Sequence, residues 1–206
     1  MRVKTQGLSE KLIPVARQEF LEKGYIDSSL RTIAQNAGMT TGAIYRRYPD
    51  KEALFDALVA DTENGFFELF TEAQNHFFDL IKTDKTNTSY NVTDNYLYVI
   101  VEYVYEHLED FQLILCHSAG SKYEDFLHKL IELEISKKND YYALLRQKGK
   151  IEGEIHPTVD HMLVTAYFTS LFEVVKHNMK KEEALLHIRQ IATFFGSGFQ
   201  SLVKFL

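Results

Sequence analysis

Residues 29–54 read SLRTIAQNAGMTTGAIYRRYPDKEAL, and this stretch decides the fold. Apolar residues recur at helical spacing over 30–37. Gly38 follows, at the place where a helix commonly ends in a left-handed residue that glycine adopts without strain. Thr40 or Thr41 can then cap a second helix by accepting from its free backbone N–H groups. The pattern therefore predicts a helix-turn-helix, a motif whose second helix enters the DNA major groove.

The same segment and its flanks resemble the DNA-binding domain of TetR-type transcriptional regulators. The residues that carry this resemblance are Ile13, Ala16, Phe20, Gly24 and Tyr25 before the motif, and Tyr45, Tyr48, Pro49, Asp50, Lys51, Glu52 and Leu54 at its end. One departure is Tyr48, where the family more often has phenylalanine, and we expect it to pack in the same way. The resemblance covers about the first quarter of the chain and implies a DNA-binding regulator.

DNA contacts are expected around the second helix of the motif. By resemblance, Tyr45 and Lys51 match positions that grip the DNA backbone, and residues 40–43 match positions that face bases. Threonine hydroxyls can bond a phosphate or a base edge, and arginines supply positive charge beside them. The predicted DNA-binding residues are Arg31, Thr40, Thr41, Gly42, Ala43, Tyr45, Arg46, Arg47 and Lys51. The alternative is that the threonines only cap a helix and the arginines only form a solvated face.

Composition is that of an ordinary soluble globular protein, with 206 residues, 45% of them hydrophobic and 25% charged. The single cysteine, Cys116, excludes an intramolecular disulfide and fits a reducing cytoplasm. It is either a small buried hydrophobe or, beside His117, a redox sensor. No apolar run follows the N-terminal basic residues, and the most apolar stretch, 96–105, is too short to span a bilayer. We therefore expect a cytoplasmic protein with no membrane partner.

Charge is distributed unevenly along the chain. The whole chain carries a formal net charge of −6, which argues against nonspecific binding of nucleic acid by the entire surface. Residues 1–55 nevertheless hold nine Lys/Arg and six Asp/Glu, a net charge of +3. A chain with a basic N-terminal region and an acidic remainder can bind phosphate at one end only.

The chain is expected to be all-α, because it has only three prolines and no convincing alternation typical of strands. An N-terminal three-helix DNA-binding domain over 1–50 is expected to precede a helical effector-binding and dimerisation domain over 51–206. The expected helices span 9–23, 30–37, 41–48, 51–81, 93–108, 109–117, 121–148, 158–179 and 181–205. The expected caps include Asp50, Thr93 or Asp94, Ser121 within a capping box, and Thr158.

Aromatic residues are abundant in the second domain, and some are expected to line a cavity for a small hydrophobic or aromatic molecule. The predicted ligand-binding residues are Tyr103, His107, Phe111, His117, Tyr123, Phe126, Tyr142 and Phe168. Glu102, Glu106 and Glu173 would favour a cationic ligand if they faced this cavity, but carboxylates of this kind are more often solvated.

The last two helices carry apolar residues on more than one face, which favours burial on two sides and a symmetric homodimer. Ala192, Gly196 and Gly198 would let a partner helix approach closely. The alternative is one central helix in a monomer.

The eight histidines form no metal-binding pattern, and no phosphate loop or nucleophile motif appears, so we expect no metal, no cofactor and no catalytic residues. The spacings of His107 with His117 and of His156 with His161 could in principle share a metal, although scattered histidines are usually surface residues. The chain is read as a ligand-responsive repressor that binds operator DNA as a homodimer. There are two alternative functions. One is a DNA-binding regulator controlled by a protein partner without a small-molecule effector, and the other is an enzyme or carrier in which the helix-turn-helix is coincidental.

Overall fold

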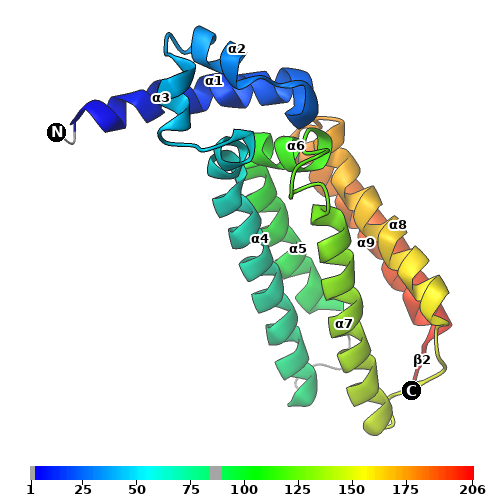
Figure 1. Cartoon of the computed structure of the whole chain (residues 1–206). Coiled ribbons are helices and arrows are strands. Elements are labelled where there is room, and N and C mark those ends of the chain that lie inside the picture. Colours follow the sequence, from blue (N-terminus) through cyan, green and yellow to red (C-terminus); the bar gives the residue numbers. More distant parts are fainter. Residues whose placement is uncertain (1–2, 84–89) are drawn as a thin grey trace. The chain divides into compact units, whose positions relative to one another are not determined.

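A computed structural model of the chain describes residues 3–83 and 90–206, with side chains from residue 11 to 83 and from 97 to 206. The expected all-α fold is confirmed (Figure 1). In chain order the described elements are α1 (Val3–Asp27), α2 (Leu30–Asn36), α3 (Thr41–Tyr45), α4 (Lys51–Lys82), α5 (Tyr90–Glu106), α6 (Leu108–Cys116), α7 (Phe126–Gln147), β1 (Ile151–Glu152), α8 (Pro157–Lys176), α9 (Lys181–Leu202) and β2 (Lys204–Phe205).

The chain forms two compact units that differ from the expected division at residue 50. Unit 1 consists of residues 1–65 and 107–126, and unit 2 consists of residues 66–106 and 127–206. The first turns of α4 and the whole of α6 therefore belong with the helix-turn-helix. Both units are discontinuous in sequence because α4, the α5–α6 connection and the start of α7 each pass from one unit to the other.

Unit 1 is built around the apolar face of α1. Leu12, Ala16 and Phe20 recur at intervals of four residues and are buried, so they form one stripe on the helix. The ring of Phe20 meets that of Phe55 on α4 edge to face, with centroids 5.0 Å apart. The helical backbone is interrupted at Gly24, whose φ of 74° lies in the left-handed region. This interruption fits the expected end of the first helix at residue 23.

The turn between α2 and α3 has the predicted chemistry. Gly38 has a φ of 67°, its N–H donates to the carbonyl of Gln35, and the N–H of Met39 donates to the carbonyl of Ala34. These two bonds form a Schellman motif, which satisfies the last carbonyls of α2. Thr40, and not Thr41, caps α3, since its hydroxyl accepts from the N–H of Ala43 at 3.3 Å.

Unit 2 contains the remainder of α4 together with α5, α7, α8 and α9. Helices α8 and α9 lie side by side along their length (Figure 1). The two short strands, which the sequence analysis did not anticipate, pair antiparallel with Ile151 opposite Phe205. Beside them, the buried Ile151 and Val203 pack in one cluster with Tyr142 and Ile81. The strands therefore tie the end of the chain to the segment between α7 and α8.

Several predicted helix boundaries are wrong. Helix α3 ends at Tyr45 rather than at residue 48, although residues 46–48 continue as a hydrogen-bonded turn. Helix α5 begins at Tyr90, so Thr93 and Asp94 lie inside it and do not cap it. Polar composition misled here, because the exposed first turns of a helix are often as polar as a loop. Residues 84–89 of the expected loop lie outside the described residues.

The predicted caps of two later helices are also wrong. Helix α7 begins at Phe126, because the Ser121 hydroxyl accepts from Tyr123 N–H and makes a local turn instead of a capping box. Helix α8 is capped by His156, whose Nδ1 accepts from the N–H of Thr158 at 3.3 Å. Pro157 then occupies the first helical position, where its missing N–H has no cost. In contrast, the predicted cap of α4 is confirmed, since Asp50 accepts from Ala53 N–H at 2.7 Å.

Replacing Gly38 with alanine should destabilise the protein by about 1–2 kcal/mol, because a Cβ strains the left-handed conformation that the turn requires. Gly42 is the matched control: it lies inside α3, and nothing lies within 4 Å of where its Cβ would be. Gly42→Ala should therefore leave stability unchanged or raise it by up to about 1 kcal/mol. Urea unfolding of the two variants measures both, and equal effects would contradict this account of the turn.

Candidate functional site

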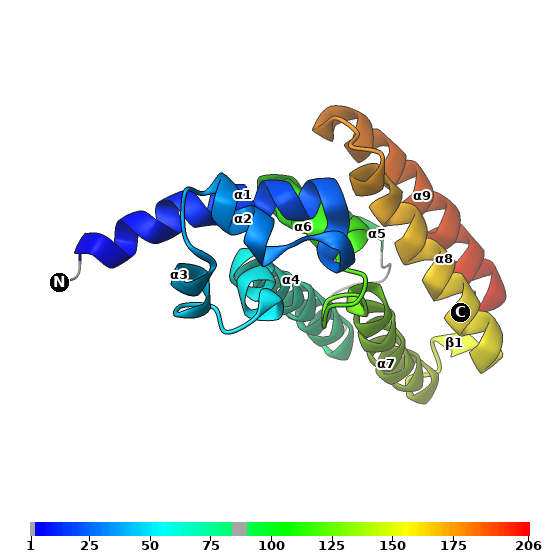
Figure 2. The same cartoon turned by 45° about the horizontal axis from the view of Figure 1, so that its top comes forward.

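Helix α3 presents a small exposed surface of unit 1 (Figure 2). Ile44 is fully buried and anchors the helix to the rest of the unit. Gly42 and Tyr45 lie on the exposed side, and 52% of Tyr45 is accessible to solvent. The Thr40 hydroxyl is engaged in capping, so Thr41 has the hydroxyl of this pair that is not used by the cap. The helix can thus offer backbone, hydroxyl and aromatic groups to a ligand outside the protein.

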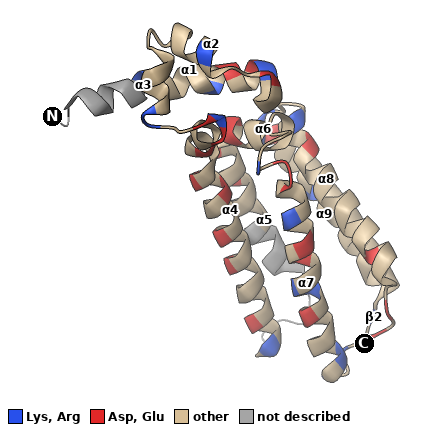
Figure 3. Cartoon of the chain, viewed as in Figure 1, with Lys and Arg blue, Asp and Glu red and all other residues tan. Residues whose placement is uncertain are grey.

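Basic residues flank this surface. Arg31, Arg46 and Arg47 are exposed, and the guanidinium of Arg47 lies 5.8 Å from the ring centroid of Tyr48. Tyr48 is buried, as expected for a residue that replaces phenylalanine in the core. By contrast, α4 carries mostly acidic charges along its length (Figure 3). We name the α3 surface, with Arg31, Arg46 and Arg47, the α3 face.

Lys51 has a different environment from the one expected of a phosphate contact. Its ammonium donates to the carbonyls of Tyr25, Ile26 and Ser28, the last two at 2.9 and 3.2 Å. It also lies 4.6 Å from the ring centroid of Tyr25. An ammonium has three N–H groups, so these carbonyls at the end of α1 use all of them. Lys51 therefore joins the start of α4 to the end of α1 and the residue after it, a role that no pattern in the sequence indicates.

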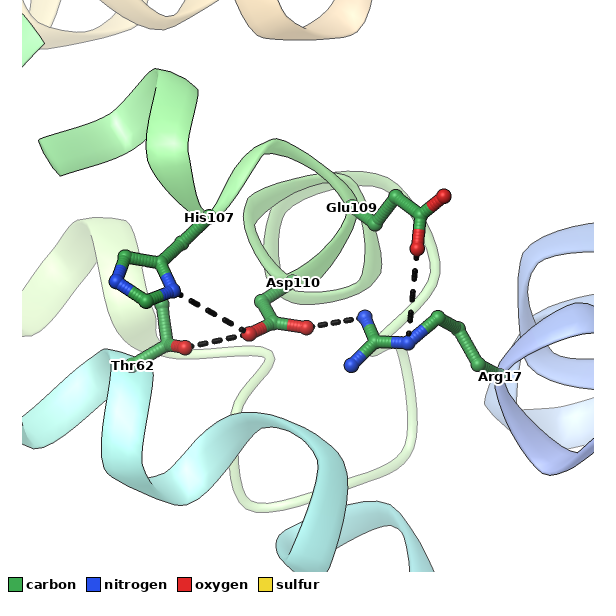
Figure 4. Close-up of polar contacts among 5 residues, drawn as sticks. All are labelled: Arg17, Thr62, His107, Glu109 and Asp110. Carbon is green, nitrogen blue, oxygen red and sulfur yellow. Dashed lines mark hydrogen bonds and ion pairs between the residues drawn. The ribbon is translucent and has the colours of Figure 1, made fainter. Parts of the chain in front are cut away.

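A buried carboxylate joins three helices of unit 1 (Figure 4). Asp110 on α6 pairs through one oxygen with the guanidinium of Arg17 on α1. Its other oxygen accepts from the hydroxyl of Thr62 on α4 at 2.5 Å and lies 4.0 Å from Nδ1 of His107. Arg17 is also 3.6 Å from the exposed carboxylate of Glu109. These bonds fix α6 to the first and fourth helices.

A second group of contacts holds the turn after α6 against α4. The hydroxyl of Tyr123 donates to Asp56, and the Lys122 ammonium pairs with the same carboxylate. The backbone N–H of Lys122 donates to Glu52 at 3.2 Å. Burial and the neighbouring carboxylate of Asp56 raise the pKa of the Tyr123 hydroxyl above its ordinary value, so it remains a donor at neutral pH. Residues 107–126 are therefore bound to the helix-turn-helix by charged and polar bonds as well as by packing.

Unit 2 contains a cavity of about 550 Å³ among α4, α5, α7, α8 and α9. Most of its wall is aromatic or aliphatic, and the rings come from every one of these helices: Phe66, Phe70, Tyr105, Tyr141, Phe168 and Phe195 are among them. Its size falls in the range of sites for small organic molecules.

Two of the eight predicted ligand-binding residues, Tyr142 and Phe168, line this cavity. Tyr103 lies on α5 outside the lining, because the face of α5 that lines it carries Val101, Val104 and Tyr105. The remaining five belong to unit 1: His107, Phe111, His117, Tyr123 and Phe126.

Three of these five are packed into the core of unit 1. The ring centroids of Phe111 and Phe126 lie 6.0 Å apart, and those of Tyr123 and Phe55 lie 5.7 Å apart. His117 accepts from the backbone N–H of Tyr25 through its carbonyl, and burial lowers the pKa of its imidazole. The expected cavity among these residues is therefore replaced by close packing of α6 against α1 and α4.

Sequence reasoning missed the polar residues of the cavity. Glu134, Lys138 and Gln74 are part of its lining, whereas Glu102, Glu106 and Glu173 are not. Glu102 pairs with Lys181, and Glu173 pairs with Lys176 at 2.9 Å. The signal that could have found Glu134 is its place on α7 one turn before Lys138, on the side of the helix that also carries Tyr141.

Helices α8 and α9 also present an exposed apolar face. Leu186, Phe194 and Leu202 are exposed on α9, and 73% of Phe194 is exposed. Val159 and Met162 are exposed on α8. Of the small residues expected to admit a partner, Gly198 is exposed. Ala192 and Gly196 instead line the cavity, so they cannot be assigned to close helix approach on this face.

The structure also places the single cysteine and the residues that could hold a metal ion. Cys116 is exposed, in contrast to the buried position that is usual for a lone cysteine. Within the described part of the chain, no group of three or more His, Cys, Asp or Glu residues is placed to hold a metal ion. No described helix combines the length and apolar character needed to cross a membrane.

The described chain is helical with an exposed N-terminal helix-turn-helix, and its N-terminal region matches known regulatory proteins. Residues 12–58 match the family described as bacterial regulatory proteins, tetR family. The chain is 36% identical over 72 residues to the HTH-type transcriptional regulator AcrR of Shigella flexneri, covering 35% of this chain and 34% of the relative. It is 43% identical over 54 residues to an HTH-type transcriptional repressor of Mycobacterium tuberculosis, covering 26% and 29%.

These matches span about a third of the length of the curated relatives. The fold similarity is wider. A member of the TetR transcriptional regulator family from Streptomyces coelicolor A3 matches 89% of this chain and 88% of its own, with a TM-score of 0.57 at 18% identity. The sequence match to the tetR family of bacterial regulatory proteins therefore lies in residues 12–58, whereas the fold similarity extends over most of the chain.

Replacing Lys51 with alanine should destabilise the protein by about 1.5–3 kcal/mol, since three carbonyls lose a charged donor. Lys11→Ala, at an exposed position of α1, is the control and should change stability by less than about 0.5 kcal/mol. Thermal and urea unfolding measure the difference. If Lys51→Ala unfolds like the wild type, the three hydrogen bonds are not structural, and the phosphate contact implied by the family resemblance becomes the better assignment.

Proposed function

We propose that this protein is a transcriptional regulator, a repressor that binds operator DNA through the α3 face and is released by a small molecule held in the cavity of unit 2. The observation that carries the proposal is the exposed α3, anchored by buried Ile44 and flanked by arginines, within a region that matches the family. The printed names of the curated relatives, a transcriptional regulator and a transcriptional repressor, support the same function. An enzymatic role has no support from these relatives.

The roles of individual residues follow from their environments. Thr41 is the proposed base contact, because the hydroxyl of Thr40 is used by the helix cap. Gly42 and Ala43 let the backbone approach the bases, and Tyr45 with Arg31, Arg46 and Arg47 contacts phosphates. Lys51 acts indirectly, by holding the start of α4 against the end of α1.

Binding as a homodimer is proposed through the exposed apolar face of α8 and α9. Leu186, Phe194 and Leu202 on α9 and Val159 and Met162 on α8 are all exposed apolar residues, and groups of such residues commonly mark protein interfaces. A two-fold dimer would also match the two-fold symmetry of operators whose half-sites lie one helical turn, about 34–36 Å, apart.

A route from the cavity to the α3 face is available along the chain. Phe66 lines the cavity and follows Thr62 on α4 by one helical turn, and Thr62 bonds to Asp110. Tyr105 also lines the cavity and precedes His107, which lies beside the same carboxylate. Asp110 in turn holds Arg17 on α1. A ligand that moves Phe66 or Tyr105 would thus bias the helix positions of unit 1, in proportion to its differential affinity for the two states.

The rival regulator without a small-molecule effector is supported by no specific feature of the described residues. A solidly filled unit 2 would have favoured it, but the cavity of about 550 Å³ is large enough for an organic ligand.

The DNA-binding proposal is tested by selecting bound sequences from a random DNA pool and comparing variants. Arg46→Ala should weaken binding to all sequences and reduce the slope of log affinity against log salt by about one. Thr41→Ala should instead change base preference at one or two positions, with a cost of about 1–3 kcal/mol. Arg189→Ala removes the same charge from exposed α9 and is the control. Identical selected sites for wild type and Thr41→Ala would remove Thr41 as a base contact.

The dimer is tested by Phe194→Glu, which should make the protein monomeric at micromolar concentration. The substitution removes apolar contact twice in a two-fold interface and buries two carboxylates, so we expect a loss of at least about 3 kcal/mol. Val99→Glu, at an exposed apolar position on α5, is the control and should leave the dimer intact. Sedimentation velocity measures the mass of each variant. A wild-type chain that is already monomeric at this concentration would rule out the proposed interface.

A further inference from the structure

The charges inside the cavity of unit 2 do not balance. Lys138 forms an ion pair with Asp160, and about nine-tenths of each side chain is buried. The Lys138 ammonium also lies 4.7 Å from the ring centroid of Phe199, so its position is fixed by both partners. Glu134, one turn before Lys138 on α7, is the remaining buried acid of this group. Lys137 and Asp140 also line the cavity and cancel each other, so Lys138, Asp160 and Glu134 leave one uncompensated negative charge when all are ionised.

Glu134 has few partners for a buried carboxylate. Among the described residues, only Gln74 on α4 donates a hydrogen bond to it, at 2.5 Å through Nε2. A carboxylate can accept about four hydrogen bonds, so most of its capacity is unused. Burial raises the pKa of Glu134, while Lys138 and the bond from Gln74 act in the opposite direction. The site thus destabilises the charged form of this acid until another positive group arrives.

Gln74 supplies a second acceptor at the same place. Its Oε1 atom is buried and has no hydrogen-bond partner. In this orientation of the amide, Nε2 donates to the carboxylate of Glu134 and Oε1 is left without a donor. The side-chain amide of Gln74 therefore has an oxygen without a donor next to the carboxylate of Glu134, which has one donor. Both residues line the cavity.

The wall around these two acceptors suits a cation with an apolar body. Phe77, Tyr141 and Phe70 belong to the same lining, and the rings of Phe77 and Tyr141 lie 5.2 Å apart. Aromatic faces attract cations as well as apolar groups, so they can hold both parts of such a ligand. An anionic ligand would meet the net negative charge, and a purely apolar one would leave Oε1 of Gln74 without a donor and Glu134 with the bond from Gln74 alone.

We propose that this cavity selects hydrophobic amines in their protonated form, with the ammonium donating to Glu134 and to Oε1 of Gln74 while the apolar body lies among the aromatic rings. The proposal rests on the effector role given to the cavity above and names the chemical class of the effector. Glu134 thereby takes the part that sequence analysis considered for Glu102, Glu106 and Glu173.

The test uses three probes of the same shape: diphenylpropylamine, diphenylpropanol and diphenylpropionate, which differ in the charge of one end. Isothermal titration calorimetry of the full chain should show the amine binding about tenfold to a hundredfold more tightly than the alcohol, as expected for charge-assisted hydrogen bonds, and the acid binding most weakly. Equal affinities for amine and alcohol, or tighter binding of the acid, would overturn the proposal.

Glu134→Gln keeps the size of the side chain and should remove most of the preference for the amine while leaving alcohol binding within about threefold. Glu173→Gln is the matched control, since Glu173 lies outside the cavity lining, and it should keep the full preference. Gln74→Met provides an independent variant that removes the orphan acceptor and should also reduce the preference. If Glu134→Gln does not fold, as judged by circular dichroism, Gln74→Met and the three wild-type affinities still decide the outcome.

Release of selected DNA by the same three probes separates this inference from the proposed function. Amine binding without DNA release would support the ligand class and contradict the effector mechanism. DNA binding and release by other molecules, with no amine preference in the calorimeter, would support the regulator and overturn the ligand class.

Discussion

The buried carboxylate of Asp110 is the constraint on which the arrangement of unit 1 depends. A buried charge is costly unless it is paired, and breaking one partner of such a group typically costs about 3–5 kcal/mol. Asp110 meets this requirement by holding Arg17 on α1 and Thr62 on α4 at once. The position of α6 is therefore tied to α1 and α4. This explains why residues 107–126, far from the motif in sequence, belong to the same unit.

The same network also bears on α4, one of the segments through which the chain passes from one unit to the other. Residues of α4 serve the polar network at Thr62 and the cavity at Phe66, within one turn of a continuous helix. A helix with paired polar groups on one turn and an aromatic wall on the next cannot rotate without disturbing one of them.

Much of the fold and part of the site could be predicted from the sequence. Gly38 and the Thr40 cap were predictable because local backbone chemistry determines them, and α4 because its apolar pattern and Asp50 cap agree. The start of α7 was not, because Ser121 can form either a cap or a turn, and contacts of Tyr123 and Lys122 with Asp56 decide between them. Lys51 was assigned to phosphate by resemblance, yet its ammonium donates to the carbonyls of Tyr25 and Ile26, which are distant in sequence.

The cavity shows why residue type alone could not locate the ligand site. Phe111 and Phe168 have the same side chain and both are buried, but one fills the core of unit 1 and the other faces open space in unit 2. Only packing distinguishes them, and packing depends on contacts far apart in sequence. The polar pair Gln74 and Glu134 is more informative, because an acceptor without a donor beside a buried acid favours a ligand that donates hydrogen bonds. In the proposed site the aromatic walls would contribute to binding in general, and this pair would select among ligands of equal size.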